Sequence, residues 1–326
     1  MKNSASNCSV IQAKTKQGFA KQTLQTDAQQ ILPALTTVFS NLQYSNISHR
    51  RLSQQGVSSG IVYQGLTRAQ HPNFGQVMIK WQLSTDNHRN MADLAYEAEA
   101  LKSISQVSNN QVSFFSIAPP LLASHHSQLK VLNNNQKLTI LVMPDYASGS
   151  LAQYLKQTLS DSQKHRFIVQ TAHLVANLHN VGWLHNDIKP SNILLDNASL
   201  RLDLLLTDFA LAQRFEALNV ENPAGTPAYL APERWQGQGA TMQSDVYAFG
   251  IMMYEVITGE RPFSIDSLSR EPLKEWATQH CQKPIPKLPV EYSRYQGVIN
   301  KALAKRVKRR YRTMEKILLD LENIGK

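Results

Sequence analysis

Apolar residues are arranged differently in the two halves of the chain. In the first half, the short apolar runs at 61–63 and 77–79 are typical of strands, and two further strands are expected to end with residues 138–143. Between them, residues 88–106 carry apolar side chains every three or four positions, which predicts a helix. Helical patterns dominate the second half. A strand-rich part followed by a helix-rich part predicts an α+β fold rather than a doubly wound sheet.

Two helices of the second half can be located from their start signals and apolar faces. Residues 160–163 read Ser-Asp-Ser-Gln, a capping box that predicts the start of a helix. The helix expected after Ser244 is apolar nearly all round, which predicts a buried core helix. Short strands are expected around 193–195 and 202–206.

The N-terminal segment has a different composition from the rest. Residues 1–44 are rich in Gln, Asn, Ser, Thr and Lys and predict a flexible polar and basic extension. Within it, residues 31–42 are more apolar and could pack as a short helix. We therefore expect the folded domain to cover residues 45–326.

The chain is long enough for a substantial core and is strongly basic. It has 326 residues, 42% of them hydrophobic, and a formal net charge of +10. The densest group of cations lies in 301–312, where only Tyr311 supplies an aromatic ring. A solvated helical surface is therefore favoured there over a nucleic-acid site, and we do not expect a nucleic-acid partner.

Neither a membrane span nor a disulfide framework is expected. The chain has no apolar run of about eighteen residues. Cys8 and Cys281 are the only cysteines and are far apart, without zinc-binding spacing. The N-terminus lacks the pattern of a secretory signal. We therefore expect a cytoplasmic protein with two free thiols; its oligomeric state is left open.

A series of short motifs follows along the chain. They are Val77–Lys80, Glu97, His185–Leu195, Asp208–Ala210, Gly225–Glu233 and Ser244–Gly250. In this order they resemble the motifs of the eukaryotic-type Ser/Thr protein kinase family, over about 45–322. The resemblance implies a two-lobed protein kinase-like fold that binds ATP and Mg²⁺ and phosphorylates Ser/Thr hydroxyls of protein substrates. It places a strand-rich N-lobe at about 45–143, a hinge at 144–147 and a helical C-lobe at 148–326.

Lys80 and Glu97 are the residues expected beside the nucleotide in the N-lobe. Glu97 lies at the edge of the apolar stripe of its helix, and a carboxylate turned toward a core needs a cation. Lys80 is the expected partner, because Glu99 falls on the opposite face of the helix. By resemblance, Lys80 would contact the α- and β-phosphates of ATP.

The catalytic loop carries the residues expected to act on the phosphate and the substrate. By resemblance, Asp187 accepts or orients the proton of the substrate hydroxyl, and Lys189 steadies the γ-phosphate. Asn192 and Asp208 would hold Mg²⁺, since oxygen ligands suit a hard cation.

The adenine ring is expected at the hinge. Met143 stands next to it, and residues 144–147 would supply backbone groups, with Asp145 among them. Pro144 has no N–H, so it can offer only its carbonyl. The donor would then be the N–H of Tyr146.

Further residues are expected to support the site rather than to react. They are His185, Thr226, Glu233, Asp245 and Arg310. Thr226 and Lys189 match the Ser/Thr class of the family, in which a threonine binds the catalytic Asp and Lys. Arg310 matches the partner of Glu233 better than its neighbour Arg309 does.

The loop expected to cover the phosphates departs from the family pattern. Counting back from Val62, only Gly60 occupies a family glycine position, and Val57 replaces the middle glycine. A side chain there would obstruct close approach to the phosphates, unless Gly56 compensates by a shift of one residue. We expect ATP affinity to be lower by about tenfold.

Two other departures concern regulation. Ala210 replaces the glycine after Asp208-Phe209, and Ala resists φ > 0, so we expect the flipped inactive state to be less accessible. Asn186 replaces the Arg that in many regulated kinases pairs with a phosphorylated loop residue, and residues 211–225 contain no Ser, Thr or Tyr. We expect activity without phosphorylation of this loop.

Three alternatives remain open at this point. A pseudokinase, a nucleotide-binding scaffold or regulator, is favoured by the altered glycine loop. A small-molecule kinase would share the Asp187/Asn192 loop, but it generally lacks the segment Gly225–Glu233. A nucleic-acid-binding protein would bind with steep salt dependence.

Overall fold

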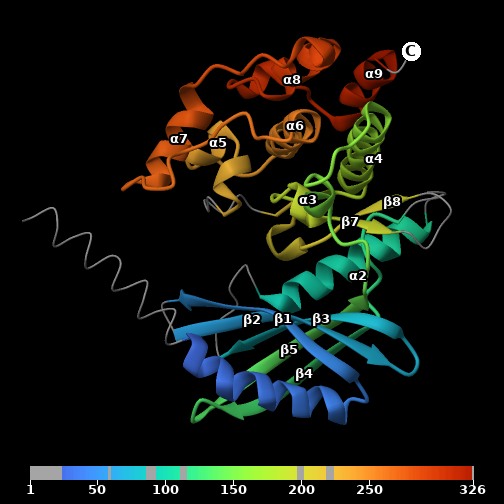
Figure 1. Cartoon of the computed structure of the whole chain (residues 1–326), viewed down its shortest axis with the longest axis vertical. Coiled ribbons are helices and arrows are strands. Elements are labelled where there is room, and N and C mark those ends of the chain that lie inside the picture. The colour runs from blue at the N-terminus through green and yellow to red at the C-terminus, as the bar shows by residue number, and fades with distance from the viewer. Residues whose placement is uncertain are drawn as a thin grey trace, which may run out of the picture. The chain divides into compact units, whose positions relative to one another are not determined.

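A computed structural model describes residues 24–57, 60–85, 93–110, 116–196, 202–217 and 224–324. The chain divides into two compact units (Figure 1). The N-terminal unit comprises residues up to 98 together with 120–145, and the C-terminal unit comprises 99–119 and 146–326. The chain passes between them after Asp145, within the segment predicted as a hinge. The predicted α+β fold, strand-rich and then helical, is confirmed.

A five-stranded antiparallel sheet forms the centre of the N-terminal unit, in the order β1-β2-β3-β5-β4. Its strands are β1 (Ser45–Val57), β2 (Gly60–His71), β3 (Gly75–Ser84), β4 (Ala123–Val131) and β5 (Asn134–Pro144). Side chains alternate between its two faces. On β3, Ile79 and Trp81 are buried on one face, and Lys80 lies on the other.

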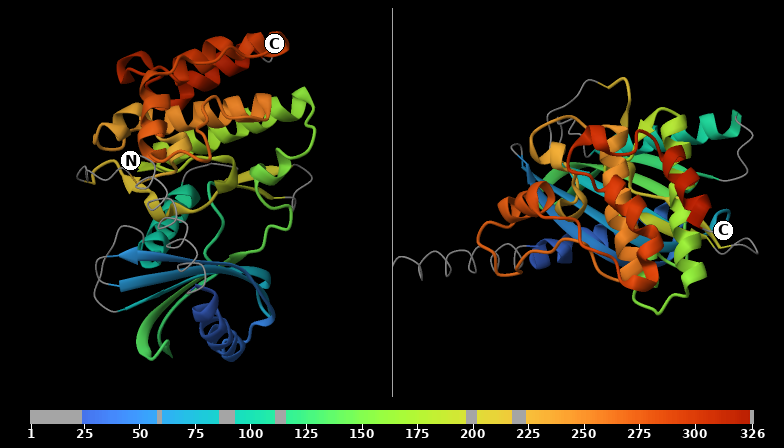
Figure 2. Two further views of the ribbon diagram at one scale, coloured as in Figure 1. Left: turned by 60° about the vertical axis from the view of Figure 1, so that its left-hand side comes forward. Right: turned by 90° about the horizontal axis from the view of Figure 1, so that it is seen from above.

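A helix over residues 24–41 covers the first of these faces. Its Ile31, Leu35 and Phe39 recur every four residues, so they share one side of the helix, and they are fully buried. The short helix considered for residues 31–42 is present, but it begins earlier than expected. The expected flexible extension is wrong for residues 24–41, because the helix gains stability by burying this apolar side. In Figures 1 and 2 the helix lies along the sheet. Residues 1–23 lie outside the described residues.

Helix α2 (Leu94–Asn110) starts in the N-terminal unit and continues into the C-terminal unit. It corresponds to the helix predicted over 88–106, of which 88–92 lie outside the described residues. Asp93 caps its start, because its Oδ1 accepts the N–H of Ala95 at 3.0 Å. Gln82 of β3 accepts the N–H of Leu94 at 3.2 Å, which ties the helix start to the sheet.

Helices dominate the C-terminal unit. They are α3 (Leu151–Tyr154), α4 (Asp161–Asn180), α5 (Pro232–Trp235), α6 (Met242–Thr258), α7 (Pro272–Gln282), α8 (Gln296–Ala302) and α9 (Met314–Ile324). The predicted capping box opens α4, since Ser160 and Gln163 exchange side chain-to-backbone hydrogen bonds. The predicted core helix is α6, in which thirteen residues are buried. It ends at Gly259 in the left-handed conformation.

Short antiparallel strand pairs and 3₁₀ turns fix the loops in the described part of this unit. β6 (Trp183–Leu184) pairs with β9 (Gln213–Arg214), which lies much later in the chain, and β7 (Ile193–Asp196) pairs with the next strand, β8 (Asp203–Leu206). The turns are η1 (Pro190–Asn192), η2 (Phe209–Leu211), η3 (Pro227–Tyr229), η4 (Val290–Tyr295) and η5 (Val307–Arg309). The predicted strands around 193–195 and 202–206 are thus paired with each other, and the chain between β6 and β7 forms a short fixed loop.

Candidate active site

Lys80 and Glu97 form an ion pair within the N-terminal unit. Lys80 Nζ lies 2.6 Å from Glu97 Oε2, and only 1% of Glu97 is exposed. Glu99 instead pairs with Lys102 at the surface. A buried carboxylate needs such a cation, and the pairing fixes the Lys80 ammonium group on the sheet face opposite the helix at 24–41.

Asp187 is the centre of a compact polar cluster in the C-terminal unit. Its Oδ1 accepts the hydroxyl proton of Thr226 at 2.6 Å and the Thr226 N–H at 3.1 Å. Its Oδ2 lies 2.5 Å from Lys189 Nζ and 3.0 Å from Asn192 Nδ2. Lys189 Nζ also donates to Thr226 Oγ1 at 2.6 Å. The cluster presents one carboxylate, 8% exposed, in a fixed orientation beside a cation.

Asp245, at the start of α6, holds the backbone of this loop. Its Oδ2 accepts the N–H of His185 and its Oδ1 the N–H of Asn186, both at 2.9 Å. His179 Nε2 lies 3.0 Å from Oδ2. Burial alone would raise the pKa of Asp245, but the hydrogen bonds and charges of His179 and His185 keep this pKa below its usual value.

The imidazole of His185 links the loop to the strand that precedes Asp208. Its Nε2 is 3.1 Å from the Thr207 carbonyl, and its Nδ1 accepts the N–H of Asp187 at 3.3 Å. The ring is fully buried and packs beside Phe209. Both ring nitrogens are occupied by the backbone, so this side chain supports the loop.

Asp208 adopts the left-handed conformation, with φ 67°. Asp tolerates this region better than most residues. Ala210 lies in η2 and has no positive φ, so the residue that replaces the family glycine is accommodated without strain. The Thr207 N–H donates to the Asn192 carbonyl at 2.9 Å, which brings the segment of Asp208 beside Asn192.

Asn186 also has a left-handed backbone, with φ 65°. Its Nδ2 donates to the Leu211 carbonyl at 2.8 Å. The residue found in place of the family Arg therefore joins the catalytic loop directly to the start of segment 211–225, of which 218–223 lie outside the described residues.

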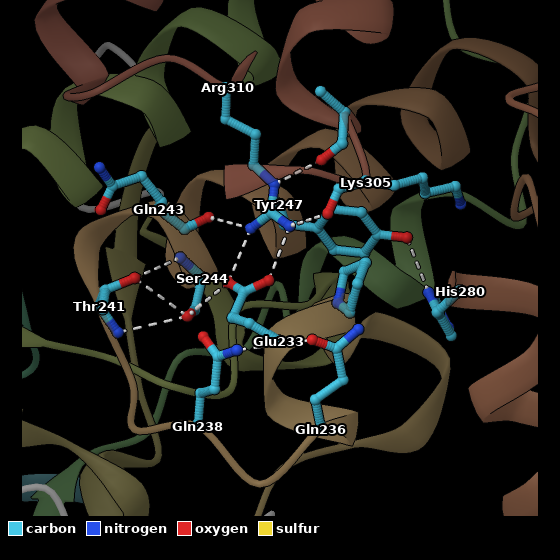
Figure 3. A network of polar contacts seen from close by, with 12 residues as sticks. Glu233, Gln236, Gln238, Thr241, Gln243, Ser244, Tyr247, His280, Lys305 and Arg310 are labelled. Carbon is cyan, nitrogen blue, oxygen red and sulfur yellow. Dashed lines mark hydrogen bonds and ion pairs between the residues drawn. The ribbon is translucent and has the colours of Figure 1, made fainter. Parts of the chain in front are cut away.

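A bidentate ion pair braces the segment that contains Glu233 (Figure 3). Arg310 Nη1 and Nη2 each donate to one oxygen of Glu233 at 2.7 Å, and its Nε donates to the Ala304 carbonyl at 2.7 Å. Ser244 Oγ also donates to Glu233, at 3.0 Å. Arg309 is exposed, so Arg310 is the residue that pairs with Glu233. Through Arg310, the pair ties α5 to the start of α6 and to segment 304–310, which precedes α9.

The predicted basic surface at 301–312 is wrong in part. This segment is the end of α8, a loop and η5 rather than one helical face. Arg310 is 4% exposed, and Lys305 is partly buried with its Nζ 4.1 Å from the ring centroid of Phe263. Burial lowers the pKa of Lys305 to about 8. Partners that are distant in sequence hold these two cations inside the unit: the Glu233 carboxylate binds Arg310, and the Phe263 ring packs against Lys305.

Sequence reasoning missed His280, on α7. It is fully buried, and its Nδ1 lies 3.0 Å from the hydroxyl of Tyr247. The rings of Trp235, Phe263 and Trp276 surround it. Burial, followed by the charge of Lys305, lowers its pKa to about 3, so the ring is neutral at ordinary pH. No motif marks this histidine; Trp276, one turn earlier on α7, is the only local signal.

The hinge residues are partly engaged within the N-terminal unit. Met143 is buried near the end of β5, and the N–H of Asp145 donates to the Gln76 carbonyl at 3.1 Å. The carboxylate of Asp145 lies 2.9 Å from Arg68 Nε. The Tyr146 carbonyl accepts the N–H of Gly149 at 2.8 Å. The role of this segment toward adenine stays a prediction.

The predicted phosphate-covering loop lies at the turn between β1 and β2. Val57 pairs with Gly60, and Ser58-Ser59 lie outside the described residues. Gly56 has no positive φ, and a Cβ there would meet nothing within 4 Å. Val62 lies on the sheet face that carries Lys80.

Asn192 and Asp208 are chemically suited to hold Mg²⁺. Asn192 Nδ2 donates to the carbonyl and to the carboxylate of Asp187, both at 3.0 Å, which leaves its Oδ1 as the group available to a cation. Oxygen donors of this kind fit a hard divalent ion.

Comparison with known proteins identifies relatives of the chain. The protein kinase domain family matches residues 58–320. The chain is 30% identical over 190 residues to a probable serine/threonine-protein kinase PknB of Lactococcus lactis, covering 55% of the chain and 29% of that protein. It is 31% identical over 201 residues to the serine/threonine-protein kinase PknA of Mycobacterium tuberculosis, covering 60% and 45%. The chain thus spans less than half the length of these relatives. No helix among the described residues is long and apolar enough to cross a membrane.

Proposed function

The chain belongs to the protein kinase family, and we propose that it transfers the terminal phosphoryl group of ATP to Ser/Thr hydroxyls of protein substrates. The observation that carries the proposal is the cluster around Asp187. A phosphoryl transfer needs an oriented acceptor for the hydroxyl proton and a cation beside it, and Asp187 with Lys189 offers both.

In the proposed reaction, Asp187 orients the substrate hydroxyl and accepts its proton. The hydroxyl oxygen forms a bond to the γ-phosphorus, the bond from that phosphorus to the β–γ bridging oxygen breaks, and ADP leaves. Lys189 stabilises charge on the transferred group, and Lys80, held by Glu97, neutralises the α- and β-phosphates.

Mg²⁺, when bound, would supply positive charge to the phosphate oxygens, and Asn192 and Asp208 are the residues that would hold it. Asn192 is held by two hydrogen bonds to Asp187, so its carbonyl oxygen would be oriented before the ion arrives. The fixed side chain lowers the entropy lost on binding.

We further propose that activity needs no phosphate on segment 211–225. The hydrogen bond from Asn186 to Leu211 supports this, because it joins the catalytic loop to that segment without a charged pair. The absence of Ser, Thr and Tyr from residues 211–225 supports it as well.

A nucleotide-binding pseudokinase is the second candidate, and the valine at position 57 favours it. A side chain at a family glycine position hinders close approach of the backbone to phosphates. The complete set of contacts around Asp187 opposes it, since a scaffold would have no need of an oriented proton acceptor.

Incubation with γ-labelled ATP, Mg²⁺ and a basic protein acceptor tests the choice. We expect label on Ser or Thr that is lost in Asp187→Ala and Lys80→Ala, while Glu99→Ala, on the outer face of α2, retains it. Label equal to that of Asp187→Ala, in folded protein that still binds ATP, would reject the kinase and favour the pseudokinase.

A further inference from the structure

The helix at 24–41 lies outside the part of the chain that matches the protein kinase family, which begins at residue 58. It nevertheless belongs to the core of the N-terminal unit. Its buried side chains pack with residues of β2, β3 and β5 in one hydrophobic cluster, in which Phe39 and Trp81 are among the largest fully buried side chains. The sheet and this helix therefore form one packed structure.

The first turn of the helix is bonded to β2. Tyr63, 3% exposed, donates its hydroxyl proton to Asp27 Oδ2 at 2.6 Å. Burial, followed by the hydrogen bond and charge of Asp27, raises the pKa of Tyr63. Tyr63 directly follows Val62, and it is paired with Gln54 of β1 near the turn that joins the two strands. The contact thus fixes the hairpin close to its tip.

A second connection between the sheet and the helix is a series of hydrogen bonds that runs from β3 through β2 and β1. The Trp81 indole N–H donates to Thr67 at 3.0 Å, Thr67 lies 2.8 Å from His49 Nδ1, and His49 Nε2 lies 2.9 Å from Thr36. Thr36 donates onward to the Leu32 carbonyl at 2.9 Å.

The indole N–H of Trp81 at one end of this series and the Leu32 carbonyl at the other determine which group donates in each hydrogen bond. An indole N–H can only donate and a carbonyl can only accept, so each hydroxyl accepts one bond and donates the next. His49 therefore accepts at Nδ1 and donates from Nε2, as a neutral ring does. Burial, the larger effect, also lowers the pKa of His49. The bonds link the helix with β1, β2 and β3.

Gly65 lets the sheet pack in this way. A Cβ at this position would lie 2.2 Å from the Trp81 ring and 2.6 Å from the Arg51 carbonyl. The missing side chain gives the indole room to lie across β2, where it reaches Thr67. This glycine therefore serves the packing on the helix side of the sheet.

We propose that the helix at 24–41 positions the β1–β2 hairpin for ATP, and that Tyr63 and Asp27 are its positioning residues. The proposal rests on the proposed function. β1 is an edge strand, so only β2 holds it within the sheet. Residues of β2 alternate between the two faces: Tyr63, Gly65 and Thr67 face the helix, and Val62 and Leu66 lie on the face of Lys80. Because both faces belong to the same strand, holding Tyr63 against the helix also sets the position of Val62 on the face of Lys80.

The test measures binding of a non-hydrolysable ATP analogue with Mg²⁺ to the full chain. Tyr63→Phe, which removes one hydroxyl, and Asp27→Ala should each raise its Kd by about three- to tenfold, and Asp27→Asn, which keeps an acceptor, should restore most of the affinity. Gln70→Ala is the matched control, because it removes an exposed hydrogen bond to Asn46 at the other end of the same hairpin. Its Kd should stay within about twofold of the parent.

Kinetics separate positioning from general destabilisation. We expect KM for ATP to rise in Tyr63→Phe while KM for the protein acceptor stays unchanged, and amide exchange in β1 and β2 to quicken more than in β4. An unchanged Kd for the analogue in both Tyr63→Phe and Asp27→Ala would overturn the proposal. A raised Kd in a chain without phosphotransfer would instead reject the proposed function and leave the positioning role standing.

Discussion

Acidification should destabilise the C-terminal unit through His280. The folded-state pKa of this residue is about 3, compared with an ordinary value of 6.5. The unfolded chain therefore binds this proton more tightly than the folded chain does. The stability that His280 contributes is complete above pH 6.5 and is lost as the pH falls from 6.5 toward 3.

The surroundings of His280 explain why protonation is costly. The ring has no exposed surface, its Nδ1 faces the Tyr247 hydroxyl, and Lys305 and Arg261 add positive charge nearby. From the two pKa values, the loss in free energy of unfolding between pH 7 and pH 5 is about 2 kcal/mol. Such a loss is a large fraction of the stability of a typical domain.

Urea unfolding at pH 7 and pH 5 measures this loss. Other histidines with lowered pKa values, among them His49 and His165, add to the pH dependence of the parent protein. The informative quantity is therefore the difference between the parent and His280→Asn, in which a side-chain oxygen can still accept the Tyr247 proton. We expect the pH dependence to shrink by about 2 kcal/mol in His280→Asn and to persist in His173→Asn, an exposed control. Equal pH dependence in the parent and His280→Asn would refute the reasoning.

Three further outcomes follow from buried contacts. Arg310→Met leaves the Glu233 carboxylate buried without its cation and should lower the free energy of unfolding, measured in urea, by about 3–5 kcal/mol. Adding Glu233→Gln should recover part of this loss, and no recovery in the double variant would contradict the reasoning. Phe39→Ala should lower the free energy of unfolding by about 3–5 kcal/mol, whereas Ser40→Ala, at the exposed next residue, should lower it by less than about 0.5 kcal/mol. Equal losses in the two variants would argue against the packed helix. Asn186→Ala removes the bond to segment 211–225 and should lower kcat by about tenfold, while phosphatase treatment of the parent should leave kcat unchanged.

Much of the fold could be predicted because its signals are local. The capping box at Ser160 and the apolar pattern after Ser244 depend on residues a few positions apart, and both helices are present. The polar cluster around Asp187 could also be predicted, because Asp187, Lys189 and Asn192 lie within one segment of six residues. Local spacing dictates such features, and so a single sequence is enough to find them.

Other features could not be predicted because their partners are distant in sequence. Lys305 belongs to the densest run of cations, yet its ammonium group lies against Phe263, which is more than forty residues earlier. His280 is neutral because of rings and charges contributed by α5, α6 and the loop before η5. A pattern of charges along the chain shows neither of these surroundings.

The N-terminal helix was underestimated for a related reason, and the sheet explains why the fold begins before residue 45. Tyr63, Ile79 and Trp81 form an apolar face on the sheet that would be exposed if the chain started with β1. A large exposed apolar face is unfavourable in water, so some element must cover it. The strand sequences contain this requirement, since every second residue of β3 from Val77 to Leu83 is apolar. The polar composition around Ile31, Leu35 and Phe39, in contrast, conceals the helix that covers this face. An apolar sheet face without an assigned partner is therefore a better guide to this boundary than the composition of the segment that precedes it.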